Sequence, residues 1–271
     1  MSKIVFIGGG NMASCLIGGM LANGFSSQDI TVSEPNEDSR NRMASTHGVL
    51  TTADNNAAVS QADIVVLAVK PQIMSAVAQP LAPALSHGPI IVSIAAGIPV
   101  NALQNWLGQG LTIVRAMPNT PAMVQSGASG LFASQSLIAD QKSVIESIFS
   151  AVGYACWVDE ESLIDAVTAV SGSGPAYFFL IYETMLKVAQ ELGLDSHVSS
   201  QLTLHTALGA ARLALASDQT PEQLRNQVTS PGGTTQAAIE SFQQQNIEAV
   251  FRTAMTSALE RAKEMSDDFA G

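Results

Sequence analysis

The sequence has few charged residues, and basic ones are the scarcest. Charged side chains make up 13% of the 271 residues, and 12 lysines and arginines stand against 23 acidic residues. The formal net charge of -11 repels nucleic acids and anionic membranes, so we expect neither as a partner. A site for an anionic ligand must therefore depend on backbone amides and helix dipoles.

Cysteine is also scarce, since the chain has only Cys15 and Cys156. They have neither a paired nor a metal-ligand spacing, and the four histidines do not cluster, so we expect two reduced, buried thiols and no metal site. The apolar start is too short for a signal peptide and lacks a cleavage motif. No uninterrupted apolar run has the length needed to cross a bilayer. A cytoplasmic protein is the expectation.

The chain does have a short apolar segment, Lys3 to Ile7, that runs directly into glycines. The spacing Gly-x-Gly-x-x-Ala from Gly8 to Ala13 predicts a buried strand, a tight turn and a helix. Gly8 allows the sharp turn, Gly10 leaves room for a pyrophosphate, and the amides at the helix start favour an anion. This pattern indicates a dinucleotide site.

An acidic residue, Glu34, follows the second predicted strand about twenty residues after the glycine turn. At this place a carboxylate binds the adenosine ribose hydroxyls, which favours NAD. Ser33, Asn36 and Arg40 are near enough to serve a 2′-phosphate if the loop turns Glu34 outward. A third interpretation is that Glu34 is a solvated loop residue.

Further apolar segments at 63–69, 90–94 and 111–116 have the continuous hydrophobic character of parallel strands covered on both faces. Each is followed by a segment suited to a ligand: Lys70-Pro71, the small residues Ala95 to Gly97, and the rigid loop Met117 to Pro121. Open α/β sheets bind ligands at this carboxyl edge. We therefore predict a doubly wound parallel sheet over residues 1–159.

From Glu160 onward, helical periodicity replaces the strand signals, so we expect an all-helical domain over residues 160–271. Ser171-Gly172-Ser173-Gly174-Pro175 interrupts two apolar helices, and Ser230 to Thr235 places glycines and hydroxyls at another helix start, an arrangement that suits a carboxylate. The helices carry more apolar surface than one short domain can cover, which predicts a dimer.

The motifs together resemble those of the pyrroline-5-carboxylate reductase family, over essentially the whole chain. The resemblance implies a Rossmann-type N-terminal domain and a helical domain that forms interlocked dimers, often assembled into decamers. It places the active site between the nucleotide domain of one subunit and the helical domain of its partner. The motifs that carry it are the turn at 8–13, Ala68 to Pro71, Met117 to Pro121, Asp165 to Thr168, Ser171 to Tyr177, and Ser230 to Thr235.

The implied reaction transfers a hydride from NAD(P)H to the C=N carbon of a five-membered cyclic imine carboxylate, and the product is L-proline. Such an imine arrives protonated or takes a proton from water, so no strong general acid is needed, and none stands out. In this resemblance Thr168 bonds the ring nitrogen as the catalytic residue, and the substrate is bound by Glu161, Ser171, Gly233, Thr234 and Thr235. The residues expected to line the cofactor are Ile7, Gly8, Gly9, Gly10, Asn11, Met12, Ser33, Glu34, Asn36, Asn55, Ala68, Val69, Lys70, Pro71, Ala95, Ala96, Gly97 and Asn119.

The family favours NADPH, and Glu34 departs from the small polar residue that several members have there. We expect NADP(H) use with a weakened preference and NAD(H) as a competitor, because a carboxylate repels a 2′-phosphate. The alternatives are a β-hydroxyacid-type dehydrogenase, for which Lys187 is the helical candidate base, and a nucleotide sensor without catalysis.

Overall fold

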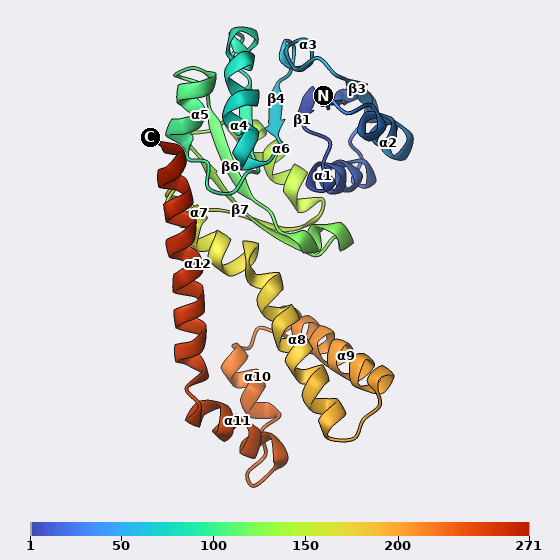
Figure 1. Ribbon diagram of the computed structural model, residues 1–271, viewed down its shortest axis with the longest axis vertical. Helices are drawn as coiled ribbons and strands as arrows, with labels where there is room; N and C mark the ends of the chain where they lie inside the picture. The colour runs from blue at the N-terminus through green and yellow to red at the C-terminus, as the bar shows by residue number, and fades with distance from the viewer. Residues whose placement is uncertain (1, 271) are drawn as a thin grey trace. The chain divides into compact units, whose positions relative to one another are not determined.

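The computed structural model describes residues 2–270, which form two compact units (Figure 1). One unit comprises the described parts of Met1–Pro175 and Ser257–Gly271, and the other is Ala176–Thr256. Residues 160–175 group with the sheet in these units, whereas the sequence analysis placed them in the helical domain. Each unit is described by itself below.

The first unit is built on one eight-stranded sheet with the order β3-β2-β1-β4-β5-β6-β7-β8. The pairs from β3 to β6 are parallel, β6 and β7 are antiparallel, and β7 and β8 are again parallel. This confirms the predicted doubly wound sheet and adds two reversed strands at one edge. The strands are β1 (Ile4–Ile7), β2 (Ile30–Ser33), β3 (Leu50–Thr52), β4 (Ile64–Leu67), β5 (Ile90–Ser93), β6 (Ile113–Met117), β7 (Gly127–Ala133) and β8 (Gly153–Trp157).

Helices cover both faces of the sheet, which is why β1 and β4 are apolar throughout. Ile4 and Phe6 of β1 belong to the core that contains α1 and α6, and Val5 and Ile7 belong to the opposite core, with α4 and α5. The helices of this unit are α1 (Asn11–Ala22), α2 (Glu37–His47), α3 (Asn55–Val59), α4 (Pro71–Ala78), α5 (Val100–Leu107), α6 (Ala139–Ser150) and α7 (Leu163–Val167), with 3-10 turns at Ser27–Asp29, Gln79–Leu85 and Thr120–Val124.

The parallel register brings the predicted ligand segments to one edge of the sheet. Ile7 pairs with Ser33 on one side and with Leu67 on the other, and Leu67 pairs with Ser93. The residues that follow these strands, Gly8, Glu34, Ala68 and Ile94, therefore leave the sheet side by side.

The second unit is helical and has almost no interior of its own. Of its residues 176–256, all of which the structure describes, only Ser199 and Thr203 are buried. Its elements are most of α8 (Gly174–Glu191), α9 (Ser196–Leu215), α10 (Pro221–Gln227), α11 (Thr234–Gln244) and the start of α12 (Ile247–Ala270), whose later turns belong to the first unit.

One stretch of the described chain, Leu163–Glu191, is long and apolar enough to cross a bilayer by length and composition alone. The sequence analysis expected no such run, because it separated two helices at the Ser-Gly-Ser-Gly-Pro segment. The structure joins α7 to α8 through a π-helical turn, Thr168–Gly172. A single stretch of this kind does not indicate a membrane protein, because interior helices of other proteins have the same properties.

Candidate functional site

The glycine turn after β1 has the two properties that a bound pyrophosphate needs. Gly8 has a φ of +102°, and a Cβ there would lie 2.9 Å from the Ala68 carbonyl oxygen, so only glycine fits. Gly10 forms the N-cap of α1 without a side-chain cap, and a Cβ there would meet no atom within 4 Å. The open space above Gly10, at a helix N-terminus, fits a dinucleotide phosphate. Around it, Asn11 is exposed, Met12 is half-buried, and Ile7 is part of the core.

Glu34 faces this turn. Its Oε2 accepts the Gly9 N–H at 2.9 Å, and its Oε1 accepts the Asn36 N–H at 3.1 Å. Arg40 donates to the carbonyl oxygens of Glu34 and Pro35, which fixes the loop. The outward orientation of Glu34 considered above is therefore not the one adopted. The carboxylate is hydrogen-bonded in a half-buried residue, and its role toward a cofactor stays a prediction.

Three further predicted cofactor residues, Ser33, Asn36 and Asn55, are hydrogen-bonded to neighbouring groups. The buried Ser33 donates from Oγ to Asn55 Oδ1 at 2.6 Å. Asn36 caps α2, because its Oδ1 accepts the Ser39 N–H at 2.9 Å. Asn55 is thus held beside the end of β2, whereas the side-chain oxygen of Asn36 is already used by its own helix.

The segments after β4 and β5 lie at the same edge. The Ala68 N–H donates to the Ile7 carbonyl oxygen at 2.8 Å, and the exposed Lys70 precedes Pro71, the first residue of α4. Val69 is half-buried. In the segment after β5, Ala95 is buried and Ala96 half-buried, and Gly97 has a φ of +75°.

The π-turn that contains Thr168 and Ser171 is fixed against the sheet. Thr168 Oγ1 donates to the Ile164 carbonyl oxygen at 2.8 Å. Asn119 Nδ2 donates to the Ser171 carbonyl oxygen at 3.0 Å, and its Oδ1 accepts the Ala128 N–H at 2.9 Å. The buried Asn119 side chain therefore ties the π-turn to β7, and this structural use was not foreseen when it was predicted to line the cofactor.

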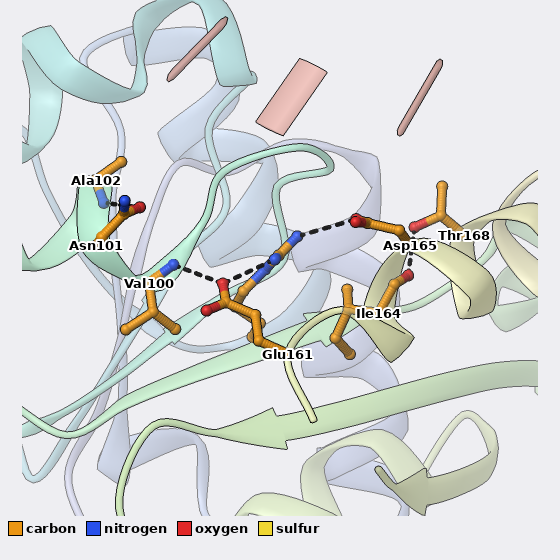
Figure 2. A network of polar contacts seen from close by, with 8 residues as sticks. Val100, Asn101, Ala102, Glu161, Ile164, Asp165 and Thr168 are labelled. Atoms are coloured by element: carbon orange, nitrogen blue, oxygen red, sulfur yellow. Dashed lines mark hydrogen bonds and ion pairs between the residues drawn. The ribbon is translucent and has the colours of Figure 1, made fainter. Parts of the chain in front are cut away.

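The sequence analysis missed a buried arginine, Arg115, whose two carboxylate partners, Glu161 and Asp165, are labelled in Figure 2. Arg115 of β6 is 4% exposed, and it donates to Glu161 Oε1 at 2.9 Å, while its Nη2 lies 3.9 Å from Asp165 Oδ1. The same Glu161 oxygen accepts the Val100 N–H at 2.7 Å. Burial raises the pKa of Asp165, and the positive charge of Arg115 opposes that shift. The signal available in the sequence was one basic residue inside the apolar strand 111–116.

In the helical unit, the turn before α11 presents backbone amides. Gly233 is the N-cap of α11 and has no side-chain cap, and Gly232 has a φ of +72°. Gly232 N–H is bonded to Gln236 Oε1 at 2.7 Å, and Thr234 and Thr235 form the first turn of the helix. The arrangement is a helix N-terminus with adjacent hydroxyls, which suits a carboxylate.

Among residues 2–270, no cluster of three or more histidine, cysteine, aspartate or glutamate side chains could hold a metal ion. The two cysteines are free and half-buried.

Two family models match parts of this chain. Residues 161–265 match the family described as pyrroline-5-carboxylate reductase dimerisation, and residues 3–97 match the family described as NADP oxidoreductase, coenzyme F420-dependent. The chain is 51% identical over 265 residues to the pyrroline-5-carboxylate reductase of Pseudomonas aeruginosa, covering 98% of this chain and 97% of that protein.

Solved structures agree with this relationship. A pyrroline-5-carboxylate reductase from Coxiella burnetii has a TM-score of 0.94 at 45% identity, with 98% of both chains covered. The Plasmodium falciparum pyrroline carboxylate reductase, solved with NADP bound, has a TM-score of 0.85 at 29% identity, again with 98% of both chains covered. The first unit has an open glycine turn in a Rossmann-type sheet, and α11 begins at Gly233 without a side-chain cap. Together with relatives of this similarity along the whole length, these features show that the chain belongs to the pyrroline-5-carboxylate reductase family.

Proposed function

We propose that this chain reduces 1-pyrroline-5-carboxylate to L-proline with NAD(P)H, the last step of proline biosynthesis. The observation that carries the proposal is the 51% identity to a pyrroline-5-carboxylate reductase over nearly the full length, which includes both amide-lined turns. When bound, the nicotinamide cofactor supplies the hydride. The protein's task is then to bind, orient and polarise the two reactants.

The cofactor site in this proposal is the carboxyl edge of the sheet. The α1 N-terminus with Gly9 and Gly10 binds the pyrophosphate, and Glu34 with Asn55 faces the adenosine ribose. The segments Ala68–Pro71 and Ala95–Gly97 line the nicotinamide half. The glycine turn supports the assignment, because a Cβ at Gly10 would fill the space that a phosphate requires.

Thr168 is the proposed partner of the substrate nitrogen. Its hydroxyl proton is directed to the Ile164 carbonyl oxygen, so Oγ1 offers a lone pair outward. A protonated imine needs a hydrogen-bond acceptor at its N–H. The Thr168 oxygen supplies one, because its own proton is donated to the Ile164 carbonyl oxygen. Because the imine is protonated in solution or by water, the role of Thr168 is to orient the ring and its positive charge.

The substrate carboxylate is proposed to bind at the start of α11, through the amides and hydroxyls of Gly233, Thr234 and Thr235. Ser171 remains a proposed substrate contact. Its hydroxyl donates to the Val167 carbonyl oxygen at 3.0 Å, which orients it in the same way as that of Thr168.

For the cofactor, we infer use of both NADPH and NADH. The Plasmodium falciparum relative was solved with NADP bound, whereas here the Glu34 carboxylate is fixed beside the glycine turn. A carboxylate favours ribose hydroxyls and repels a 2′-phosphate by about 1 kcal/mol near a surface.

The family assignment makes the protein a homo-oligomer through its dimerisation region. We propose that the dimers assemble further into decamers. We also propose that the boundary between the cofactor-binding domain and the helical domain falls between residues 159 and 160. The enzyme is proposed to work in the cytoplasm without nucleic-acid or membrane partners. The formal net charge of -11 supports the last point, because it disfavours anionic partners.

A direct assay tests the activity. Adding 1-pyrroline-5-carboxylate to enzyme and NADPH should cause a loss of NADPH absorbance and form L-proline in equal amount. Supplying a 3-hydroxy acid with the oxidised cofactor should give no signal. Turnover of the hydroxy acid alone would instead identify a β-hydroxyacid-type dehydrogenase, and cofactor binding without turnover of either compound would identify a sensor.

A further inference from the structure

The loop between β5 and α5 does not provide a side-chain hydrogen-bond acceptor at the N-cap of α5. It contains Gly97 in a left-handed conformation, and it runs through Pro99 into α5. Pro99, the N-cap of α5, provides no side-chain hydrogen bond to the first-turn amides. The beginning of α5 therefore needs an acceptor from elsewhere in the fold.

Glu161 provides that acceptor from a distant part of the sequence. Its Oε1 receives the Val100 N–H at 2.7 Å and a guanidinium N–H of Arg115 at 2.9 Å (Figure 2). The Arg115 side chain is 5% exposed, and a buried cation must stay paired. The ion pair therefore holds the Glu161 carboxylate where it caps α5.

The same loop is in contact with the last turns of α12, which belong to the same compact unit. A Cβ at Gly97 would lie 2.8 Å from Met265 Cβ and 3.2 Å from Met265 Cε. Phe269, one turn further along the helix, packs against the core cluster that includes Ala95 and Val100. The loop is thus held by a carboxylate at its end and by a helix packed on its glycine.

We propose that Glu161 and Met265 are positioning residues for the Ala95–Gly97 loop, and that Glu161 acts on the cofactor side through Val100 without touching the substrate. This inference rests on the proposed function in one respect, namely that the Ala95–Gly97 loop lines the nicotinamide half of the cofactor site. It revises the substrate-binding role that the family resemblance implied for Glu161. The observation behind it is that Glu161 Oε1 already accepts an amide N–H and a buried guanidinium N–H, which holds the carboxylate at the start of α5.

Loss of either residue should change the position of the loop without removing any group that binds the imine. A misplacement of about 1 Å at a hydride donor costs up to about 100-fold in rate. We expect Glu161→Gln, which keeps an acceptor but loses the charge, to lower kcat by about tenfold and raise the Kd for NADPH by about threefold. Met265→Ala should change both in the same direction, and the KM for the imine should stay within about twofold.

The experiment compares these variants with matched controls. Glu160→Gln removes the same charge from an exposed neighbour, and Met123→Ala truncates a methionine that is 63% exposed; both should behave like the wild type. The Kd for NADPH is measured by fluorescence titration without imine, and kcat and KM by the absorbance assay. A tenfold rise in the imine KM for Glu161→Gln, with an unchanged NADPH Kd and kcat, would overturn the inference, as would wild-type values throughout.

A second measurement separates positioning from loss of folding. Hydrogen exchange at the Val100 amide should be faster in Glu161→Ala, while exchange in β1 and β4 stays slow. Unchanged exchange at Val100 would contradict the inference. Failure of the wild type to reduce 1-pyrroline-5-carboxylate would overturn the proposed function alone, because the NADPH titration and the exchange experiment do not depend on that substrate.

Discussion

At the scale of single residues, Gly8 and Gly10 have different physical roles although both belong to one motif. Gly8 is required by the protein's own backbone, since its φ is +102° and the Ala68 carbonyl oxygen leaves no room for a Cβ. Gly10 has an ordinary φ of -73° and open space around it. The first glycine is therefore needed for folding, and the second leaves open the space in which the proposed dinucleotide phosphate binds.

This difference makes a prediction. Gly8→Ala should lower the free energy of unfolding by about 1–3 kcal/mol, because alanine is strained there. Gly10→Ala should change that free energy by no more than about 0.5 kcal/mol, and should raise the Kd for NADPH about tenfold, since the methyl group fills the phosphate space. Urea denaturation and fluorescence titration measure the two quantities. Equal destabilisation by both variants would contradict the distinction.

A second prediction at this scale concerns Glu34 and the preference between NADPH and NADH. Glu34→Ser removes a carboxylate near the proposed 2′-phosphate position, so the ratio of kcat/KM for NADPH to that for NADH should rise about fivefold, which corresponds to about 1 kcal/mol. Glu37→Ser, which removes an exposed charge from the start of α2, is the control. A wild-type preference for NADPH that does not change in Glu34→Ser would mean that Glu34 does not discriminate between the cofactors.

A third prediction concerns His47 and the pH dependence of the free energy of unfolding. Burial lowers the pKa of His47, whose Nε2 is hydrogen-bonded to Ser14 Oγ at 2.8 Å. The unfolded chain therefore takes up this proton first as the pH falls below about 6.5. The stability that depends on neutral His47 is present above that pH and is lost as the pH falls through the folded-state pKa. The free energy of unfolding should fall less between about pH 7.5 and pH 5.5 in His47→Gln than in the wild type; equal losses would contradict the prediction.

At the scale of elements, helix N-termini fall into two groups. α2, α3, α9 and α10 have side-chain caps from Asn36, Asp54, Asp195 and Thr220. α1, α4, α5, α6, α7 and α11 have no hydrogen bond from their N-cap side chain, and four of these helices, α1, α4, α5 and α11, begin at the proposed sites. A side-chain cap would occupy the amides that a phosphate or carboxylate needs. At α5 the free position is instead taken by Glu161.

The start of α11 can be tested on this basis. Thr235→Ala removes a hydroxyl from the proposed carboxylate site, and should raise the KM for the imine about tenfold while leaving the KM for NADPH within about twofold. Thr229→Ala is a matched control, because its hydroxyl donates to the Arg225 carbonyl oxygen at 2.6 Å. A larger effect of Thr235→Ala on the NADPH KM would place the carboxylate elsewhere.

At the scale of the whole molecule, the helical unit cannot be stable as an isolated chain. None of its apolar side chains is buried, and many are widely exposed, including Phe179 at 61%, Leu180 at 63% and Leu202 at 55%. A unit of this size needs a buried apolar core to offset its conformational entropy. A partner subunit that covers these faces provides one, in agreement with the dimerisation family that the region matches.

Light scattering should therefore give at least twice the chain mass of 28.2 kDa at micromolar concentration. Leu202→Glu, which places a charge on an exposed apolar helix, should dissociate or unfold the assembly and abolish activity. Leu50→Glu, at a similarly exposed leucine of β3, should keep the wild-type mass and activity. A monomeric, active wild type would contradict this account of the helical unit.

Features that depend on local chemistry can be predicted from the amino-acid sequence. The glycine turn, the apolar strands and the glycine-rich start of α11 could each be predicted within a few residues of where they lie, because short-range sterics and hydrogen bonding specify them. Three features depend on tertiary packing: the orientation of Glu34, the link that Asn119 makes between the π-turn and β7, and the capping of α5 by Glu161 beside the buried Arg115. These contacts join residues that are 9 to 61 positions apart. No local pattern can specify such pairs, because they are selected by the packing of the sheet and by the need of a buried charge for a partner.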